Sequence, residues 1–108
     1  MKLVQFDFPY GGPWGEEMAS AHSGLAKVIG GTPGLLWKIW IENREKGEAG
    51  GIYLFADEKS AAEYVKEHTA RLEGFGLKNI RAKVFDVNEG LNRITRATFC
   101  EKGARAGA

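Results

Sequence analysis

The 108-residue sequence predicts one α+β domain, in which a four-stranded antiparallel sheet carries two helices on one face. Three observations lead to this prediction. A hydrophobic content of 44% in a chain of this length is sufficient for a single core. The spacing of the apolar residues changes twice from the alternation of a strand to the period of a helix and back. Segments rich in glycine and proline separate these periodic regions.

The first half of the chain predicts a strand, a helix and a second strand. Residues 2–8 alternate as a strand does, and residues 9–15 break the pattern with three glycines and two prolines. Residues 16–29 have helical spacing, the glycines of residues 30–34 end that helix, and residues 35–42 form the next strand. The residues that share one side of each element are Val4, Phe6 and Phe8, then Met18, His22, Leu25 and Ile29, then Leu35, Trp37, Ile39 and Ile41. The last of these faces is wholly apolar, so we expect it to turn toward the helices.

The second half repeats this order. Residues 43–51 are polar and contain glycine, so they are expected to turn the chain back as a hairpin. Residues 52–56 are continuously apolar, which is typical of a central strand. A helix capped by Asp57 or Ser60 then runs to about Gly74. Its inward stripe consists of Ala61, Val65, His68 and Leu72.

The end of the chain completes the domain. Residues 80–87 form the last clear strand, and residues 90–99 form either a short helix or an added edge strand. Residues 101–108 are small and polar without periodicity, so we expect a frayed tail after a single domain of residues 1–100.

The element order is β-α-β followed by β-α-β. Right-handed crossovers and a central hairpin then favour the ferredoxin-like α+β sandwich, with both helices on one face of the sheet. The other face, expected to carry Trp40, has nothing in this short chain to cover it. An apolar face of that size requires a partner, most simply a second copy related by two-fold symmetry.

The composition argues against several classes of function. A net charge of +1 does not favour a broad nucleic-acid or anionic-membrane surface. The single cysteine, Cys100, excludes an internal disulfide framework and fits a reducing, cytoplasmic setting. No signal peptide and no apolar run long enough to span a bilayer is expected. No metal is expected either, because the two histidines lack a ligand spacing, although one histidine would be enough to bind a haem.

The glycine-rich segment before the first helix is a weak candidate for phosphate binding. Residues 11–15 precede a helix, where a phosphate loop would lie. The segment lacks the spacing of the nucleotide-binding motifs, and Glu16 and Glu17 would repel a phosphate. A turn that leads into a helix explains it better.

The two histidines are more informative. His22 and His68 each lie on the apolar stripe of their own helix, and these helices are expected to lie side by side. They are either core-edge residues that bind backbone carbonyls, or one of them lies in a cavity and titrates near neutral pH. His68 is the better candidate because Arg71 follows one turn later and could bind an anionic oxygen.

The aromatic residues predict an apolar core and a flat pocket. Rings occur on every predicted strand and in the first loop, and most of them are expected in the core or an interface. Tyr53 adds a hydroxyl that could hold or protonate a phenolic oxygen.

Four segments carry a resemblance to a known family. Residues 33–40 (PGLLWKIW), 48–55 (EAGGIYLF), 67–72 (EHTARL) and 83–89 (KVFDVNE) resemble the YdhR-like mono-oxygenases of the dimeric α+β barrel superfamily. The resemblance extends over about residues 3–97.

The resemblance implies a homodimer whose two sheets pack face to face. It also implies oxygenation of small aromatic or quinol-type compounds without a cofactor. His68, Tyr53 and Trp37 are then the candidate catalytic residues, and Arg71, His22, Phe6 and Phe8 the candidate substrate-binding residues. Trp40 and Phe85 are the candidate interface residues.

Two other classes of function remain open. Within the same superfamily, an isomerase or a non-catalytic ligand-binding protein would fit the same fold. Outside it, residues 51–55 resemble an RNA-recognition strand, in which aromatic side chains stack on bases. The net charge near zero and the missing basic residue before the glycine argue against this last alternative.

Overall fold

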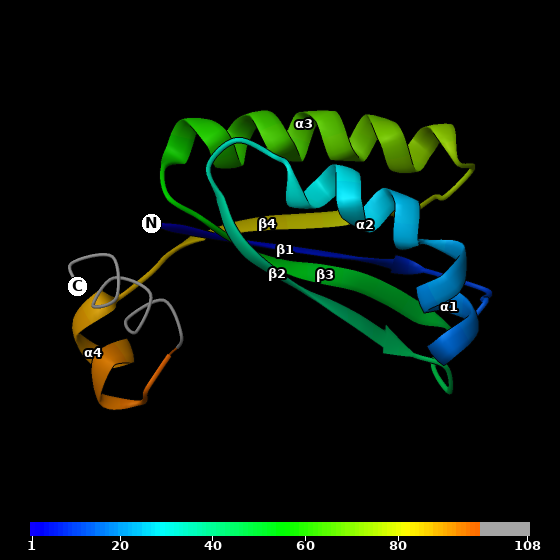
Figure 1. Cartoon of the computed structure of the whole chain (residues 1–108), viewed down its shortest axis with the longest axis horizontal. Helices are drawn as coiled ribbons and strands as arrows, with labels where there is room; N and C mark the ends of the chain where they lie inside the picture. The colour runs from blue at the N-terminus through cyan, green and yellow to red at the C-terminus, as the bar shows by residue number, and fades with distance from the viewer. Residues whose placement is uncertain (98–108) are drawn as a thin grey trace.

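The computed structural model describes residues 1–97, and in this part of the chain four strands form one sheet. The strand order is β2-β3-β1-β4, with every neighbouring pair antiparallel. Helices α1, α2 and α3 cover one face of this sheet, whereas α4 extends away from them beyond the end of β4 (Figure 1). The elements are β1 (Lys2–Pro9), α1 (Gly15–Ala21), α2 (Ser23–Gly30), β2 (Leu35–Asn43), β3 (Glu48–Phe55), α3 (Glu58–Gly74), β4 (Arg81–Asp86) and α4 (Glu89–Ile94).

The strand order is that of the ferredoxin-like α+β fold, and it confirms the predicted fold class. β2 and β3 form the hairpin, and β1 lies between β3 and β4. The two central strands are the most buried ones, because each is flanked by a strand on both sides and covered by helices.

The core lies between the two central strands and α3. Val4 and Phe6 of β1 and Phe55 of β3 have no exposed surface, and Tyr64 of α3 is 1% exposed. The Phe6 ring meets the Tyr64 ring edge-on, with 6.2 Å between centroids. Each such ring contributes roughly 1.5–3 kcal/mol on burial, so this cluster is a main source of stability and fixes α3 on the sheet.

The first helix is not continuous, which corrects one prediction. The sequence pattern predicts a single helix over residues 16–29, but α1 ends at Ala21 and α2 begins at Ser23. His22 between them departs from helical geometry, with φ −109° and ψ 11°. Ser23 and Gly24 follow it, and both are weaker helix formers than alanine, so a break costs little here.

The faces of β2 are the reverse of those predicted. Leu35 lies opposite Phe55 and Trp37 lies opposite Leu54, so the intervening Leu36 is an extra residue in a β-bulge. A one-residue insertion moves every later side chain to the other face of the sheet. Trp37, Ile39 and Ile41 therefore lie on the face without helices, and Lys38, Trp40 and Glu42 lie on the helix-covered face.

The start of α3 is anchored to the start of β2. Asp57 is the N-cap, because its carboxylate accepts a hydrogen bond from the Ser60 N–H at 2.8 Å. Gly34 has φ +80°, and an added Cβ there would lie 2.3 Å from Ser60 Oγ. Glycine is thus required at this position both for its backbone conformation and for the close approach of the helix.

The sheet face opposite the helices carries exposed apolar side chains. Ile39 of β2 is 53% exposed and Phe85 of β4 is 47% exposed. In α4, Leu91 and Ile94 are also largely exposed. Of the two structures predicted for residues 90–99, a short helix or an edge strand, the helix is confirmed for the part that α4 (Glu89–Ile94) covers.

Two predictions about the chain end fall outside the described residues. These are the domain limit at residue 100 and the frayed tail of residues 101–108. Within residues 1–97, no helix has the length and apolar character required to cross a membrane.

Candidate functional site

A cavity of about 60 Å³ lies between the helices and the sheet. Strands β1, β2 and β3 line the cavity on one side, and helices α1, α2 and α3 line it on the other. Most of its wall is apolar, and the main apolar side chains are Phe8, Met18, Leu25, Trp40, Leu72 and Phe75. The polar side chains that reach it are Tyr10, His22, Lys38, Tyr53 and His68.

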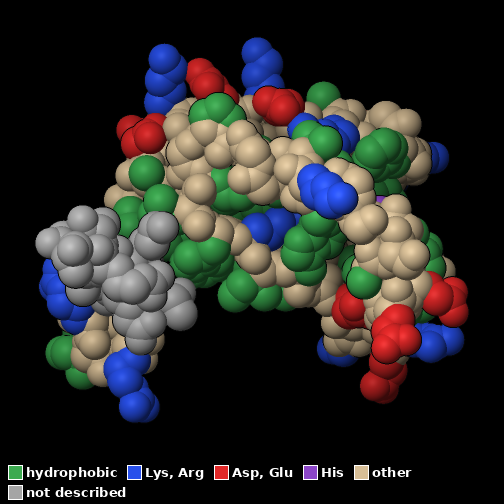
Figure 2. All heavy atoms as spheres, in the orientation of Figure 1, with side chains coloured by type: hydrophobic (Ala, Val, Ile, Leu, Met, Phe, Trp, Pro, Cys, Tyr) green, Lys and Arg blue, Asp and Glu red, His purple; other side chains and the backbone are tan. Residues whose placement is uncertain are grey.

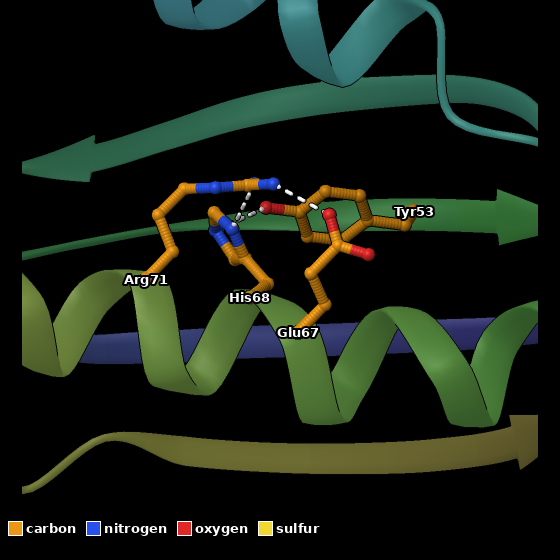
Figure 3. Close-up of polar contacts among 4 residues, drawn as sticks. All are labelled: Tyr53, Glu67, His68 and Arg71. Atoms are coloured by element: carbon orange, nitrogen blue, oxygen red, sulfur yellow. Dashed lines mark hydrogen bonds and ion pairs between the residues drawn. The ribbon is translucent and has the colours of Figure 1, made fainter.

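His68 projects from the buried face of α3 and is 3% exposed. Its ring stacks on Tyr64 at 4.9 Å between centroids and meets Phe6 edge-on at 5.1 Å. Both ring nitrogens have partners: Nδ1 lies 2.9 Å from an Arg71 guanidinium nitrogen, and Nε2 lies 3.3 Å from the Tyr53 hydroxyl (Figure 3).

These contacts determine the tautomer of His68. A guanidinium can only donate, so Nδ1 accepts from Arg71 and the ring proton is on Nε2. Nε2 therefore donates to the Tyr53 oxygen. Because that oxygen serves as an acceptor, the hydroxyl hydrogen of Tyr53 can donate either to the neighbouring Tyr64 hydroxyl or to a ligand in the cavity, which Tyr53 lines.

Arg71 is held in turn by Glu67, whose carboxylate lies 2.9 Å away on the same face of α3 (Figure 3). Glu67 is mostly exposed and Arg71 mostly buried, so the charged end of this chain of contacts lies at the surface. The order Glu67–Arg71–His68–Tyr53 leads from solvent to the cavity wall.

Burial keeps both inner groups of this chain uncharged. Desolvation, with smaller effects from Lys38 and Arg71, lowers the pKa of His68 to about 3. Desolvation also raises the pKa of Tyr53 well above its usual value. The hypothesis that His68 titrates near neutral pH is therefore wrong, although its placement in the cavity is confirmed.

Lys38 is the residue that the sequence-based list of candidates omitted. Its Nζ lies 3.4 Å from the centroid of the Trp40 ring and 4.6 Å from that of Tyr53. Desolvation, with a smaller effect from Arg71, lowers its pKa to about 7. The available signal was a lysine between two tryptophans in the apolar first part of the strand, but the bulge hid the face on which it lies.

Gly51 leaves room for the Lys38 side chain to cross the sheet. An added Cβ at Gly51 would lie 2.7 Å from Lys38 Cε and 2.9 Å from two atoms of the Tyr53 ring. The absence of a side chain on the neighbouring strand thus brings the amine and the phenol together.

The other end of the cavity is formed by His22 and Tyr10. The Tyr10 hydroxyl lies 3.1 Å from His22 Nε2, and the His22 ring lies parallel to Trp40 at 6.4 Å. Two larger surface hollows adjoin the cavity here, of about 550 and 470 Å³, and His22 lines both. The cavity and both hollows thus meet at the His22 side chain.

The model of a protein family described as "Putative mono-oxygenase ydhR" matches residues 3–98. The chain belongs to this mono-oxygenase family. A solved structure from Deinococcus radiodurans, titled as a putative antibiotic biosynthesis monooxygenase, has a similar fold, with a TM-score of 0.58. It is 10% identical, and the match covers 82% of this chain and 93% of that one. No curated protein matches the sequence.

In this YdhR-family chain, most of the predicted site residues lie at one place. Tyr53, His68 and Arg71 are joined by hydrogen bonds, and His22 and Phe8 line the same cavity. Phe6 contacts His68 from behind but does not line the cavity.

The two tryptophans of β2 exchange places relative to the predictions. Trp37 lies on the sheet face without helices, and its buried Nε1 has no hydrogen-bond partner among the described residues. Trp40, expected on the uncovered face, lines the cavity instead. Phe85 lies on the uncovered face as expected.

Residues 1–97 contain no group of three or more His, Cys, Asp or Glu side chains that could hold a metal ion. The donors that do meet at the cavity are two imidazoles, two phenols and one amine. Their arrangement suits binding of an oxygen atom of an organic ligand.

Proposed function

We propose that this protein is a mono-oxygenase that oxidises a small phenol or quinol with dioxygen and uses no bound metal or organic cofactor. Membership in the mono-oxygenase family supports the reaction class. The observation that carries the substrate class is the mostly apolar cavity with the Tyr53 hydroxyl and the Lys38 amine at one wall. Such a site would bind a flat ring and hold one polar oxygen on it.

The proposed reaction balances without an external reductant. A phenol with a free para position reacts with dioxygen to give a quinone and water. The para C–H bond is broken, one oxygen atom forms the new C=O bond, and the other leaves as water with the two released hydrogens. All electrons that reduce dioxygen come from the ring.

The protein contributes by favouring the ionised ring oxygen. A phenolate is more electron-rich than a phenol, so it transfers an electron to dioxygen more readily. Tyr53 would donate a hydrogen bond to this oxygen, and His68 would act as a positioning residue that keeps the Tyr53 hydroxyl oriented. Trp40 would lie against the ring of the ligand.

The size of the cavity limits how the ligand binds. A cavity of about 150 Å³ takes up a benzene-sized molecule, whereas this one has about 60 Å³. We therefore expect the reacting end of the ring in the cavity and the rest of the ligand in the adjoining hollows near His22.

The experiment is an oxygen-uptake assay on the purified protein, treated with a chelator, with a panel of phenols and hydroquinones. We expect uptake above the autoxidation rate and, from the phenols with a free para position, a quinone product that carries one atom from labelled dioxygen. Tyr53→Phe should lower kcat more than it raises KM, because the lost hydrogen bond strengthens as the oxygen becomes charged. Uptake at the autoxidation rate only would contradict the proposal.

The same assay separates the alternatives within the superfamily. Tight binding without turnover would favour a ligand-binding protein, and a product of unchanged mass would favour an isomerase. The RNA-recognition alternative is disfavoured by the orientation of β3. Tyr53 and Phe55 face the helices and are 1% and 0% exposed, so they cannot stack on bases.

The assembly we propose is a homodimer that covers the sheet face without helices. Ile39 and Phe85 are about half exposed on this face. Helix α4, which carries the exposed Leu91 and Ile94, lies beyond the end of β4 (Figure 1). Exposed apolar side chains on a sheet face are typical of an interface. A two-fold pairing of two such faces would also give α4 a surface to contact.

The visible charges do not suggest a nucleic-acid partner. Lys and Arg side chains alternate with Asp and Glu along the α3 side of the molecule, without a continuous basic surface on the face shown in Figure 2. This distribution agrees with the net charge of +1.

A further inference from the structure

Lys38 lies among aromatic side chains without a negatively charged partner among the described residues, which is an unusual position for a lysine. Its side chain crosses Gly51 and ends between two aromatic rings, 3.4 Å from the Trp40 centroid and 4.6 Å from the Tyr53 centroid. Within residues 1–97, none of the ion pairs involves Lys38. Lys38 is partly buried. A lysine in such a position usually has an ionic partner, and contact with ring faces offsets only part of the desolvation cost.

The neighbours of Lys38 on α3 and β3 are neutral or positively charged, so none of them balances the charge of its ammonium form. From α3, His68 is neutral, and Arg71 is a cation that is paired with the exposed Glu67. From β3, Tyr53 is neutral because burial raises its pKa.

The remaining neighbours do not supply a counter-ion. On β2 itself, the Glu42 carboxylate accepts a hydrogen bond from the backbone N–H of Gly15. His22 and Tyr10 at the far end bind each other. An oxygen anion on a ligand would therefore be the missing partner of Lys38.

His68 cannot act as the base at this wall. Its Nδ1 lone pair accepts from Arg71 and its Nε2 donates to Tyr53, so neither nitrogen has a free lone pair that faces the ligand. The amine of Lys38, in contrast, has a free lone pair whenever it is uncharged. Its pKa of about 7 makes that form abundant at neutral pH.

We propose that Lys38 binds and deprotonates the acidic hydroxyl of the substrate, which makes the ligand class a flat ring with a phenolic or enolic hydroxyl. This inference rests on the proposed function only for the oxidation that follows. The Lys38 lone pair takes the hydroxyl proton, so that the O–H bond breaks and an N–H bond forms. The oxygen keeps the bonding electrons as a phenolate, and the resulting ammonium remains beside it.

Lys38 and Tyr53 then both stabilise the phenolate oxygen. The ammonium of Lys38 and the hydroxyl of Tyr53 both donate to the phenolate oxygen, and Trp40 lies beside the ring. A charge-assisted hydrogen bond of this kind is roughly twice as strong as a neutral one, so Lys38 would dominate selection for ionisable hydroxyls.

The test uses a nitrophenol, whose phenolate and phenol forms have different visible spectra, under anaerobic conditions in which no oxidation occurs. At a pH one unit below the pKa of the free probe, the wild-type protein is expected to bind it as the phenolate. Lys38→Met should bind it roughly ten- to a hundredfold more weakly and as the neutral phenol. The control Lys66→Met, on the exposed surface of α3, should match the wild type.

A second pair of variants keeps the test valid if Lys38→Met folds poorly. Lys38→Arg retains a cation that never deprotonates, so it should still bind the phenolate but lose the rise of kcat/KM with pH near 7. Lys38→Gln should behave as Lys38→Met. Circular dichroism spectra establish that each variant is folded before it is compared.

The outcomes separate this inference from the proposed function. An unchanged spectrum and affinity in both Lys38→Met and Lys38→Gln would overturn the role of Lys38, whatever the oxygen uptake. Phenolate binding that depends on Lys38, without oxygen uptake for any phenol, would leave the inference standing and refute the mono-oxygenase proposal. Oxygen uptake above the autoxidation rate, together with an unchanged spectrum and affinity in both Lys38 variants, would refute the inference and leave the mono-oxygenase proposal standing.

Discussion

Burial has opposite consequences for the side chains that meet at the cavity. His68 loses its capacity to titrate near neutrality, because desolvation lowers its pKa to about 3. Lys38 gains that capacity, because desolvation lowers its pKa from 10.5 to about 7. The same physical effect thus makes the imidazole a fixed hydrogen-bonding group and the amine a proton acceptor.

The lowered pKa of Lys38 makes stability depend on pH. Between about pH 7 and 10, the unfolded chain holds a proton on Lys38 that the folded chain has released, so the unfolding free energy should rise with pH. The expected rise is on the order of a few kcal/mol. Above that window it should reverse, since burial raises the pKa of Tyr64 to about 12 and keeps its proton on the folded chain.

Urea unfolding at a series of pH values checks this prediction. Lys38→Met should remove the rise between about pH 7 and 10, and Lys66→Met should retain it. The same rise in Lys38→Met as in the wild type would mean that another group is responsible.

The positions of the strands and helices could be predicted from the periodicity of apolar residues. The face on which each side chain lies could not always be predicted in this way. The α3 stripe was predicted correctly for Ala61, His68 and Leu72, because a helix without insertions keeps its period. On β2, the single extra residue Leu36 reversed the assignment of Trp37 and Trp40. Nothing in the local sequence marks a bulge at a leucine, so the error could not be removed by closer reading.

The interruption of the first helix has a similar cause. The stripe of Met18, His22, Leu25 and Ile29 has the spacing of a continuous helix, and three of these residues do pack inward. The side chain of His22 binds Tyr10 at one end of the cavity, which is a tertiary contact. Local propensity cannot report such a contact.

Gly51 of β3 is a position where an added methyl group should be costly. In Gly51→Ala the new Cβ would overlap Lys38 Cε and the Tyr53 ring, which are packed on the sheet. We expect a loss of about 1–3 kcal/mol in unfolding free energy, together with weaker phenolate binding as Lys38 is displaced.

The matched control is Gly24→Ala in α2, where an added Cβ meets no atom within 4 Å. It should be neutral or stabilise the protein by up to about 1 kcal/mol, because alanine favours a helix. Thermal and urea unfolding of both variants provide the measurement, and an equal effect at the two positions would contradict the packing argument.

At the scale of the whole molecule, the fold could be predicted from the sequence. The proposed homodimer follows from the sheet face that no helix covers. Element order and handedness rules were sufficient to predict the sheet and the position of its helices. The sequence could not identify the hydrogen bonds among Tyr53, His68 and Arg71, because they depend on side-chain positions across two elements.

The proposed homodimer leads to a prediction for the uncovered face. Phe85→Lys should shift the protein from dimer to monomer, because a buried, unpaired ammonium at an apolar interface is strongly unfavourable. Val28→Lys is the control, since Val28 is 61% exposed on α2, on the other side of the sheet. Sedimentation velocity gives the answer, and a wild-type monomer at micromolar concentration would refute the dimer.

The central place of β1 has a consequence for how the polypeptide acquires its structure. Of the four strands in residues 1–97, β1 is synthesised before the others, yet one of its two neighbours in the sheet is β4, which is synthesised after them. A nascent chain on the ribosome therefore leaves one edge of this central strand unpaired until translation has passed Asp86. Slow translation of the final third would prolong that exposure and give chaperones their main opportunity to bind.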